Sequence, residues 1–268
     1  MKTSTSKRLR WNVAIWLAAG LFMTSTAGMA SGPIMPDPKA EARHQPQVEE
    51  TANGIPLVNI TAPSSGGVSR NEYETFNVPD KGAILNNSYT LSKTELAGYV
   101  QGNNNMAERP AKIIVNEVTG AGSTSMDGFL EVAGNRADVV IANPNGITVN
   151  GGGFINTGKA FLTTGKPVYD GEDHLQRFDI TGGDILIEGK GLGGKETESL
   201  AILSRAVKIN AGIWAEDLHI TTGANTVDAK TLEASAIEGK GGRPAFALDT
   251  AAIGGMYAGR ITLPDGSP

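Results

Sequence analysis

Three kinds of residue in this sequence have types and spacings that could support chemistry. The first is a glycine run at residues 189–194, which reads G-x-G-x-x-G and follows the apolar run DILIE (184–188). In dinucleotide-binding proteins such a run approaches a pyrophosphate and opens a helix within a βαβ unit. No βαβ series surrounds this match, so we interpret it as a glycine-rich corner and predict no dinucleotide site.

Histidines are the second kind. The sequence has three of them, His44, His174 and His219, and none lies at a metal-ligand spacing from another. His219 alternates with Leu218 and Ile220, so its side chain is expected to face solvent. We predict no metal site at these residues.

Acidic residues crowded into YDGEDH (169–174) are the third kind. Asp170, Glu172 and Asp173 could hold a cation, but they fit no calcium-loop pattern, so we interpret the segment as a solvated loop. The sequence has no G-x-S-x-G motif and no cysteine. We therefore predict no catalytic residue, no cofactor and no enzymatic activity.

Asparagine and glycine dominate VVIANPNGITVNGGGFINTGKAFLTTG (139–165), where they separate short apolar runs. Within it, Pro144 pre-sets its own φ, while Asn143 and Asn145 can fold their side chains back onto nearby backbone groups. Gly146 can supply a left-handed conformation, and Ile147 restarts an apolar run. These five residues form either a purely structural turn or a turn that a partner protein recognises, and both interpretations stay open.

Short strands must position these turns. Runs rich in Val, Ile, Thr and Phe, each ended by a turn former, predict strands. They are LVNIT (57–61), KIIVNEV (112–118), FLEVA (129–133), DVVIAN (138–143), GITV (146–149), FINT (154–157), AFLTT (160–164), FDIT (178–181), DILIE (184–188), AVKIN (206–210), LHITT (218–222) and ALDT (247–250). TLSKTELAGYV (90–100) and KETESLAILSR (195–205) favour a short helix each.

The ends of these runs favour a parallel β-helix. Single Asn or Gly residues mark the corners, and segment 153–165 weakly repeats in segment 212–223. In such a coil Ile and Val fill the inside of each turn, Asn side chains bond from one turn to the next, and turns stack about 4.8 Å apart. The alternative is a β-sandwich with Gly- and Asn-rich loops.

The N-terminus has the pattern of a secretory signal peptide. Four basic residues precede the apolar run WNVAIWLAAGLF (11–22) and the small residues TSTAGMA (24–30), and this run is shorter than the roughly 20 residues of a membrane span. We assign 1–30 to the signal peptide and 31–54, which is rich in proline, to a disordered leader. The folded domain is then 55–268.

Charge excludes one class of partner. Removal of the signal peptide would take the formal net charge from −5 to −9, because residues 1–30 hold four basic residues and no acidic ones. A chain this acidic has no electrostatic footprint for nucleic acid. Without cysteine, its stability must come from its core and backbone pairing.

The stretch ANPNGITVNGGGFINTG (142–158) resembles the secretion domain at the N-terminus of two-partner secretion exoproteins of the filamentous haemagglutinin and haemolysin type. Further segments resemble that domain in the same order, so the resemblance covers roughly 55–261. They are GAILNNSY (82–89), LAGYVQGNNN (96–105), KIIVNEVTG (112–120), LEVAGNRADVVIANPNGI (130–147) and ALDTAAIGGMYAGRI (247–261).

This resemblance implies an all-β fold: a right-handed parallel β-helix with an N-terminal cap and small extra-helical β elements. It also implies two short secretion motifs. One is intact as Asn143, Pro144, Asn145, Gly146 and Ile147. The other is usually Asn-Pro-Asn-Leu and here reads Asn103, Asn104, Asn105 and Met106, so its turn loses the φ that proline fixes. Some members have a Cys-x-x-Cys after the intact motif, where this chain has Val149 and Gly152.

The function implied is a secretion-targeting domain of a haemagglutinin, adhesin or contact-dependent toxin. The general secretion machinery would export it through the periplasm, and an outer-membrane transporter with periplasmic docking domains would pass it to the surface of a Gram-negative-type bacterium. One alternative is a stand-alone surface adhesin that binds host glycans or proteins. A carbohydrate-active enzyme ranks last, since the acidic residues are scattered. Whether the chain is a fragment of a larger exoprotein stays open.

Overall fold

Strands form nearly all of the regular structure in the computed structural model, which describes residues 32–107, 109–194, 196–242, 244–250 and 255–263. Two 3₁₀ helices, η1 (Ala42–His44) and η2 (Asn104–Met106), are the only helices within these ranges. No helix of the described residues is long and apolar enough to span a membrane. The predicted signal peptide, 1–30, lies outside the described residues.

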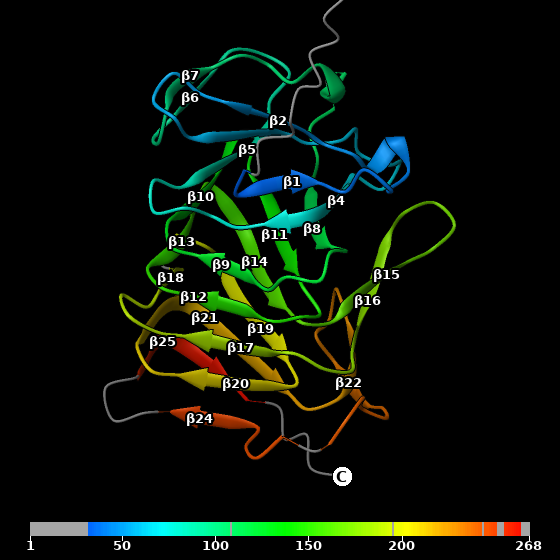
Figure 1. The fold of residues 1–268 in the computed structure, drawn as a ribbon, viewed down its shortest axis with the longest axis vertical. Coiled ribbons are helices and arrows are strands. Elements are labelled where there is room, and N and C mark those ends of the chain that lie inside the picture. Colours follow the sequence, from blue (N-terminus) through cyan, green and yellow to red (C-terminus); the bar gives the residue numbers. More distant parts are fainter. Residues whose placement is uncertain (1–31, 108, 195, 243, 251–254, 264–268) are drawn as a thin grey trace, which may run out of the picture. The chain divides into compact units, whose positions relative to one another are not determined.

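The strands form three parallel ladders, which the chain visits in turn (Figure 1). The first ladder is β4 (Val68–Phe76), β8 (Ile113–Val118), β11 (Ala137–Ala142), β14 (Thr157–Thr163), β19 (Ser199–Ser204) and the second half of β21 (Gly212–Thr222). The second ladder is β3 (Pro56–Asn59), β5 (Ala83–Asn87), β10 (Phe129–Gly134), β13 (Gly152–Ile155), β18 (Leu192–Gly194) and the first half of β21.

The third ladder consists of β9 (Thr124–Met126), β12 (Ile147–Val149), β17 (Asp184–Ile187), β20 (Ala206–Ile209) and β24 (Leu248–Thr250). The last strand, β25 (Gly255–Thr262), lies parallel to β21. One turn of the coil, such as β11, β12 and β13, therefore contributes one strand to each ladder. This confirms the parallel β-helix and excludes the sandwich.

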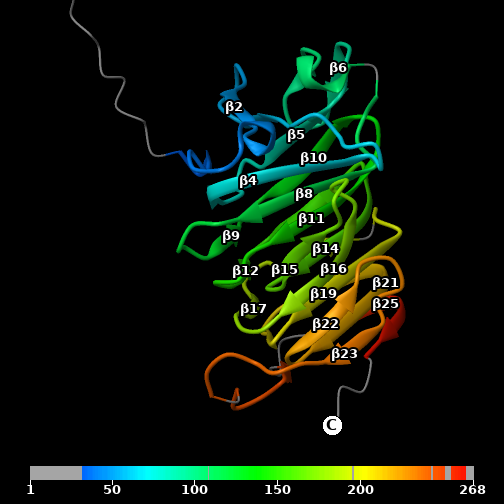
Figure 2. The same cartoon turned by 90° about the vertical axis from the view of Figure 1, so that its right-hand side faces the viewer.

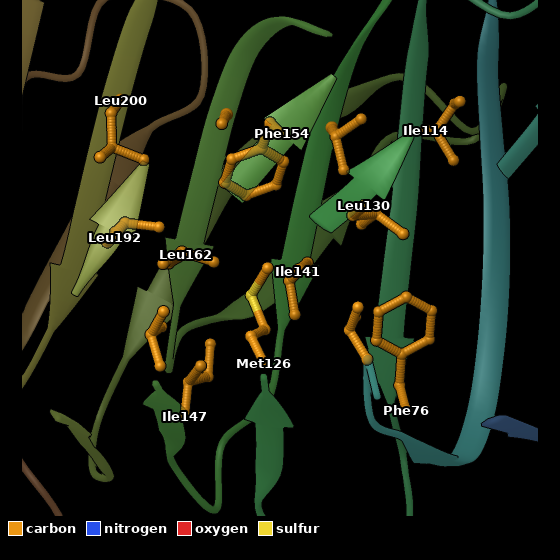
Figure 3. Close-up of a cluster of buried hydrophobic side chains, with 14 of the residues drawn as sticks. Phe76, Ile114, Met126, Leu130, Ile141, Ile147, Phe154, Leu162, Leu192 and Leu200 are labelled. Carbon is orange, nitrogen blue, oxygen red and sulfur yellow. The ribbon is translucent and has the colours of Figure 1, made fainter. Parts of the chain in front are cut away.

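Aliphatic side chains of successive turns stack inside the coil. Ile147 lies opposite Ile185, and Ile185 lies opposite Val207, each of them at most 1% exposed. Figure 3 shows Ile147 and Met126 side by side in this interior, with Phe154 and Leu162 from the neighbouring strands. Burying each such side chain stabilises the fold by about 1.5–3 kcal/mol.

Asparagine side chains connect one turn to the next, as predicted. The Nδ2 of Asn87 donates to the carbonyls of Ala111 and Asn135, both at 2.9 Å, and its Oδ1 accepts from the backbone N–H of Ala111 at 2.7 Å. Asn116 donates to the carbonyl of Val140 at 3.1 Å. The short ladders leave some buried backbone N–H and C=O groups without a backbone partner. The asparagine amides form hydrogen bonds with these groups, because buried polar groups need such partners.

The N-terminal segment is ordered, so the prediction of a disordered leader at 31–54 is wrong for its described part. Strand β1 (Ile34–Pro36) pairs antiparallel with β4, and β2 (Gln47–Glu50) pairs antiparallel with β3. The two strands lie at the two ends of the 14-stranded sheet and cap its first turn. Few apolar residues suffice here because Ile34 enters the main core and the backbone pairs with existing edges.

Both predicted helices are strands. Residues 90–100 form the hairpin of β6 (Ser92–Thr94) and β7 (Gly98–Val100), whose apolar residues cover the outer face of β5 and β10 around Ile84 and Ala133. Residues 199–204 form β19, where Leu200 and Ile202 face the interior while Ala201 and Leu203 join a second apolar cluster. Burial on both faces outweighs the helix propensity of this sequence.

A small antiparallel sheet covers one outer face of the coil (Figure 2). It consists of β15 (Lys166–Tyr169), β16 (Leu175–Ile180), β22 (Asn225–Asp228) and β23 (Ala234–Ala236). Phe178 of this sheet packs on Phe161 of β14, with ring centroids 5.9 Å apart. Val140 and Leu203 belong to the same cluster, which explains why β11 and β19 are apolar on both faces.

Candidate functional site

The turn at residues 143–147 joins β11 to β12 and is held by the side chain of Asn143. This side chain is fully buried, its Oδ1 accepts from the backbone N–H of Asn145 at 2.9 Å, and its Nδ2 donates to the Gly122 carbonyl and the Thr124 hydroxyl, each at 3.0 Å. The backbone N–H of Gly146 closes the turn on the Asn143 carbonyl at 3.1 Å. Asn143 thus fixes the turn and ties it to the preceding turn of the coil.

The other residues of this turn divide into buried and exposed ones. Gly146 has a φ of +112°, a region that side-chain-bearing residues rarely adopt, and Ile147 points into the core beside Met126 (Figure 3). Pro144 and Asn145 are exposed. Asn145 also donates through Nδ2 to the Gly120 carbonyl at 2.8 Å. A partner can therefore touch only the tip of the folded turn.

The turn at residues 103–106 is built in the same way around η2. The Oδ1 of Asn103 accepts from the backbone N–H of Asn105 at 3.0 Å, and its Nδ2 donates to the carbonyls of Ile60 and Asn86, both at 2.9 Å. Asn105 donates to the same Ile60 carbonyl at 3.0 Å. Met106 enters the main core and is 1% exposed.

The two turns match atom for atom in their local bonds. In each, the first Asn accepts from the N–H two residues later, and the backbone N–H three residues later returns to its carbonyl at 3.1 Å. Asn104 takes the exposed place of Pro144. Without proline, the φ of residue 104 is not fixed before the turn forms. In the folded domain, the hydrogen bonds of the asparagines hold the same geometry without proline. The two turns share no hydrogen-bond partner, so they are separate features of the surface.

The first half of the glycine run at 189–194 is a corner, as we predicted, while Leu192–Gly194 form strand β18. This corner leads from β17 into the strand β18, where a dinucleotide site would need a helix. Gly191 has a φ of +81°, and a Cβ on it would lie 2.1 Å from the Gly212 carbonyl oxygen. Glycine is required there by the close approach of two turns of the coil.

The three histidines have separate environments. His174 Nδ1 lies 2.9 Å from Asp170 Oδ2 in the loop between β15 and β16, where the carboxylate accepts the hydrogen bond. His219 lies on the outer face of β21, half-buried rather than fully solvated, and burial lowers its pKa. Among the described residues, no group of three or more His, Asp or Glu side chains could hold a metal ion.

Sequence reasoning missed a buried charged cluster beneath the N-terminal cap. The Arg70 guanidinium lies 2.8 Å from Glu72 Oε1 and 3.4 Å from Glu117 Oε2, and its Cζ lies 4.4 Å from the Tyr169 ring centroid. His44, which we had placed in the leader, lies 3.1 Å from Glu72 and is only 4% exposed. Because these residues are far apart in sequence, no local pattern reveals them.

This cluster joins three separate elements electrostatically. Arg43 of η1 pairs with Asp173 of the β15–β16 loop at 2.5 Å, so the cap and the outer sheet are linked through it. Burial raises the pKa of Glu117, despite the opposing charge of Arg70. Burial also raises the pKa of Tyr169, whose hydroxyl has no hydrogen-bond partner among the described residues. The cluster links the cap to the coil and to the outer sheet, and a pocket of about 210 Å³ borders it at His44, Arg70 and Asp173.

Comparisons with known proteins identify similar chains. A family model described as the TPS secretion domain matches residues 33–267. The 16S rRNA endonuclease CdiA of Enterobacter cloacae is 46% identical over 239 residues, which cover 88% of this chain and 7% of that protein. The Toxin CdiA of Yersinia pestis is 47% identical over 236 residues, covering 87% of this chain and 7% of that protein.

A solved structure is similar as well. The crystal structure of the filamentous hemagglutinin secretion domain superposes with a TM-score of 0.78 at 33% sequence identity, covering 87% of this chain and 78% of that chain. This chain spans about 7% of the length of the curated relatives it matches. Their names therefore describe proteins far longer than the domain described above.

Proposed function

Because this chain belongs to the TPS secretion domain family, we propose that it is a secretion address, that is, the domain by which one dedicated outer-membrane transporter recognises an exoprotein. The observation that carries this proposal is the family match over 33–267, which spans the whole β-helix. The match to a secretion domain of known structure supports the same role. These matches do not favour a stand-alone adhesin.

We propose that the chain passes through the periplasm in an extended form. Residues 1–30 would direct it to the general secretion machinery, and the absence of cysteine from all 268 residues means that no disulfide can lock it before export. The strands of the coil are three to eleven residues long. In an extended chain their backbone N–H and C=O groups are free to pair with a sheet edge of the transporter's periplasmic domains.

In this proposal the chain folds at the cell surface, after it has passed the transporter. Each strand of the ladders pairs with the preceding and the following turn, as β11 pairs with β8 and β14. A coil of this kind grows by adding one turn to an existing edge. The cap formed by β1 and β2 supplies the first edge, because it pairs with β4 and β3.

The exposed tips of the two asparagine turns are the parts that a transporter would read. Pro144 is exposed and cannot donate a hydrogen bond, so replacing it changes the surface more than the fold. Asn104 offers the corresponding position in the second turn. Recognition of Pro144, Asn145, Asn104 and Asn105 is thus separable from the structural role of Asn143 and Asn103.

The test is a secretion assay in a Gram-negative host that produces the full chain with or without its cognate transporter. We expect the chain in the medium only when the transporter is present. Pro144→Ala should reduce the released fraction several-fold, while Asn150→Ala, an exposed residue at the next corner, should leave it unchanged.

Two outcomes would contradict different parts of the proposal. Release that does not depend on the transporter would reject the secretion address. Dependence on the transporter with equal release of Pro144→Ala and the native chain would reject the turn as the part that is read. Whether the exoprotein is a toxin, as the CdiA relatives are named, or an adhesin is decided by sequence beyond this domain.

A further inference from the structure

One outward-facing row of residues crosses five neighbouring strands of the coil. The parallel register places Phe129, Gly153, Gly193, Trp214 and Tyr257 opposite one another in that order. The aromatic side chains are exposed or half-buried: Phe129 is 44% and Tyr257 is 60% exposed, and Trp214 is intermediate. Two aromatic walls therefore face each other across two strands that have no side chain at this position.

Gly153 has a structural reason to be glycine, since a Cβ there would lie 2.5 Å from the Phe129 ring. Gly193 has none. Its φ is outside the left-handed region, and a Cβ would meet nothing closer than 3.8 Å. Every other strand glycine in the described residues has either a positive φ or a neighbour within 3.4 Å of that Cβ position. Because position 193 has no side chain, the space between the two aromatic walls stays open there.

A groove of about 490 Å³ lies over Gly193, and its walls are mostly apolar. Phe129 and Trp214 form two of its walls, with Ile155 beside them. Glu95 and Glu196 line the same groove, and neither carboxylate has an ion-pair partner among the residues that the structure describes. The groove thus combines an apolar floor, aromatic rings and two unpaired negative charges.

We propose that this groove binds a lysine or arginine side chain of an extended segment of a partner protein. The aliphatic stem of such a side chain would lie over Gly193 between the rings, and its cation would reach the two carboxylates. Charge complementarity selects this occupant, because an acidic or purely apolar segment would leave the carboxylates unpaired. This groove exists only in the folded domain, and binding to it does not depend on recognition of the chain by the transporter.

The chain already contains the same arrangement internally. The Arg70 guanidinium stacks on the Tyr169 ring at 4.4 Å while Glu72 pairs with it at 2.8 Å. In the groove, Trp214 and Phe129 take the place of the tyrosine ring, and Glu95 and Glu196 take the place of the glutamate. Among the residues that the structure describes, no cation pairs with Glu95 or Glu196, and an external chain can supply one.

The test uses Trp214 as its own reporter. The full chain has two other tryptophans, Trp11 and Trp16, and a W11F/W16F background leaves Trp214 as the only indole. The probe is the peptide acetyl-Leu-Arg-Leu-Arg-Leu-amide, titrated at low salt while Trp214 fluorescence is measured. We expect saturable binding that weakens as salt is added, and no binding of the matched peptide with glutamate in place of arginine.

Two variants test the groove itself. Gly193→Val should weaken peptide binding at least tenfold while the urea midpoint stays unchanged or rises, because a Cβ at this position meets nothing closer than 3.8 Å and valine favours a strand. Glu95→Gln/Glu196→Gln, which leaves the packing intact, should weaken binding several-fold and remove its salt dependence.

The proposal is overturned if the arginine peptide does not bind, or if Gly193→Val and the double glutamine variant bind it as the native chain does. Binding of a neutral oligosaccharide in place of the peptide, or self-association of the chain that Gly193→Val abolishes, would assign the groove to another occupant and reject this one. Transporter-dependent release of Gly193→Val should equal that of the native chain, which separates this test from that of the secretion address.

Discussion

Replacement of Asn143 by alanine should destabilise the folded domain far more than replacement of Asn145, the exposed asparagine of the same turn. The side chain is fully buried and makes three hydrogen bonds to backbone and hydroxyl groups of the turn and of the preceding turn of the coil, at 2.9, 3.0 and 3.0 Å; a fourth, from Asn145 Nδ2 at 3.1 Å, is lost in Asn145→Ala as well. Alanine removes all three and leaves the Asn145 N–H without the acceptor that it has in the native turn.

The expected cost follows from these bonds. A net contribution of about 1 kcal/mol for each gives a loss of about 3 kcal/mol, and a buried donor left without an acceptor adds to it. Asn145→Ala is the matched control, because its amide bonds lie at the exposed side of the same turn. It should cost about 0.5–1 kcal/mol.

Urea denaturation followed by far-UV circular dichroism measures the difference. With a slope of about 2 kcal/mol per molar urea, Asn143→Ala should lower the midpoint by about 1.5 M and Asn145→Ala by less than about 0.5 M. Asn103→Ala should resemble Asn143→Ala, since it loses three equivalent bonds. Equal midpoints for Asn143→Ala and Asn145→Ala would refute the idea that buried asparagines hold the corners.

Three further predictions follow from the same structure. Asn104→Pro should stabilise the fold by about 0.4–1 kcal/mol, because Asn104 is the first residue of η2 and Asn103 before it is extended. Asn105→Pro should destabilise the fold, because it removes the backbone N–H that donates to Asn103. Thermal melts of both variants test this difference. Burial raises the pKa of Glu117 above its usual 4.5, so ionising this carboxyl lowers the stability of the native chain as pH rises above 4.5. Glu117→Gln has no such carboxyl, and its urea midpoint relative to that of the native chain should therefore increase from pH 4 to pH 7. A decrease would mean that folding lowers the pKa of Glu117 instead. Ile187→Ala should cost about 2–5 kcal/mol by leaving a cavity between stacked turns, and a midpoint close to the native value would show that this stack can collapse.

Much of the fold was predictable because each turn of the coil repeats the same local requirements. Short runs such as 138–143 and 184–188 end at Asn or Gly, and the structure bends there. The run at 189–194 was interpreted as a corner because no βαβ series surrounds it, and residues 189–191 do turn the chain before β18 begins at Leu192. Local chemistry therefore identified both the coil and its asparagine turns.

The errors all occur where distant segments decide the local structure. Residues 34–36 and 47–50 are strands only because β4 and β3 offer them edges, which composition does not reveal. The segment 195–205 has good helix formers, yet its strand is buried between the interior and the outer sheet. Glu72 pairs with both His44 and Arg70 and so joins the cap to the coil across segments with no shared pattern.

The groove over Gly193 was equally invisible in the sequence. The row of five residues that crosses it comes from five strands between 129 and 257, and only the register brings these residues together. A Gly-x-aromatic pattern recurs at Trp214 and Tyr257 and is the one signal that could have indicated exposed rings.

The most direct test of the account is export of a chain whose neighbouring turns are cross-linked. Thr148 and Leu186 are opposite each other on β12 and β17 and partly exposed, so Thr148→Cys/Leu186→Cys can form a disulfide in the oxidising periplasm of a chain that otherwise has no cysteine. We predict that the oxidised double variant stays in the cell, that a reductant restores its release, and that each single cysteine variant is released normally. Release of the oxidised double variant at the native rate would show that the domain does not cross its transporter as an extended chain.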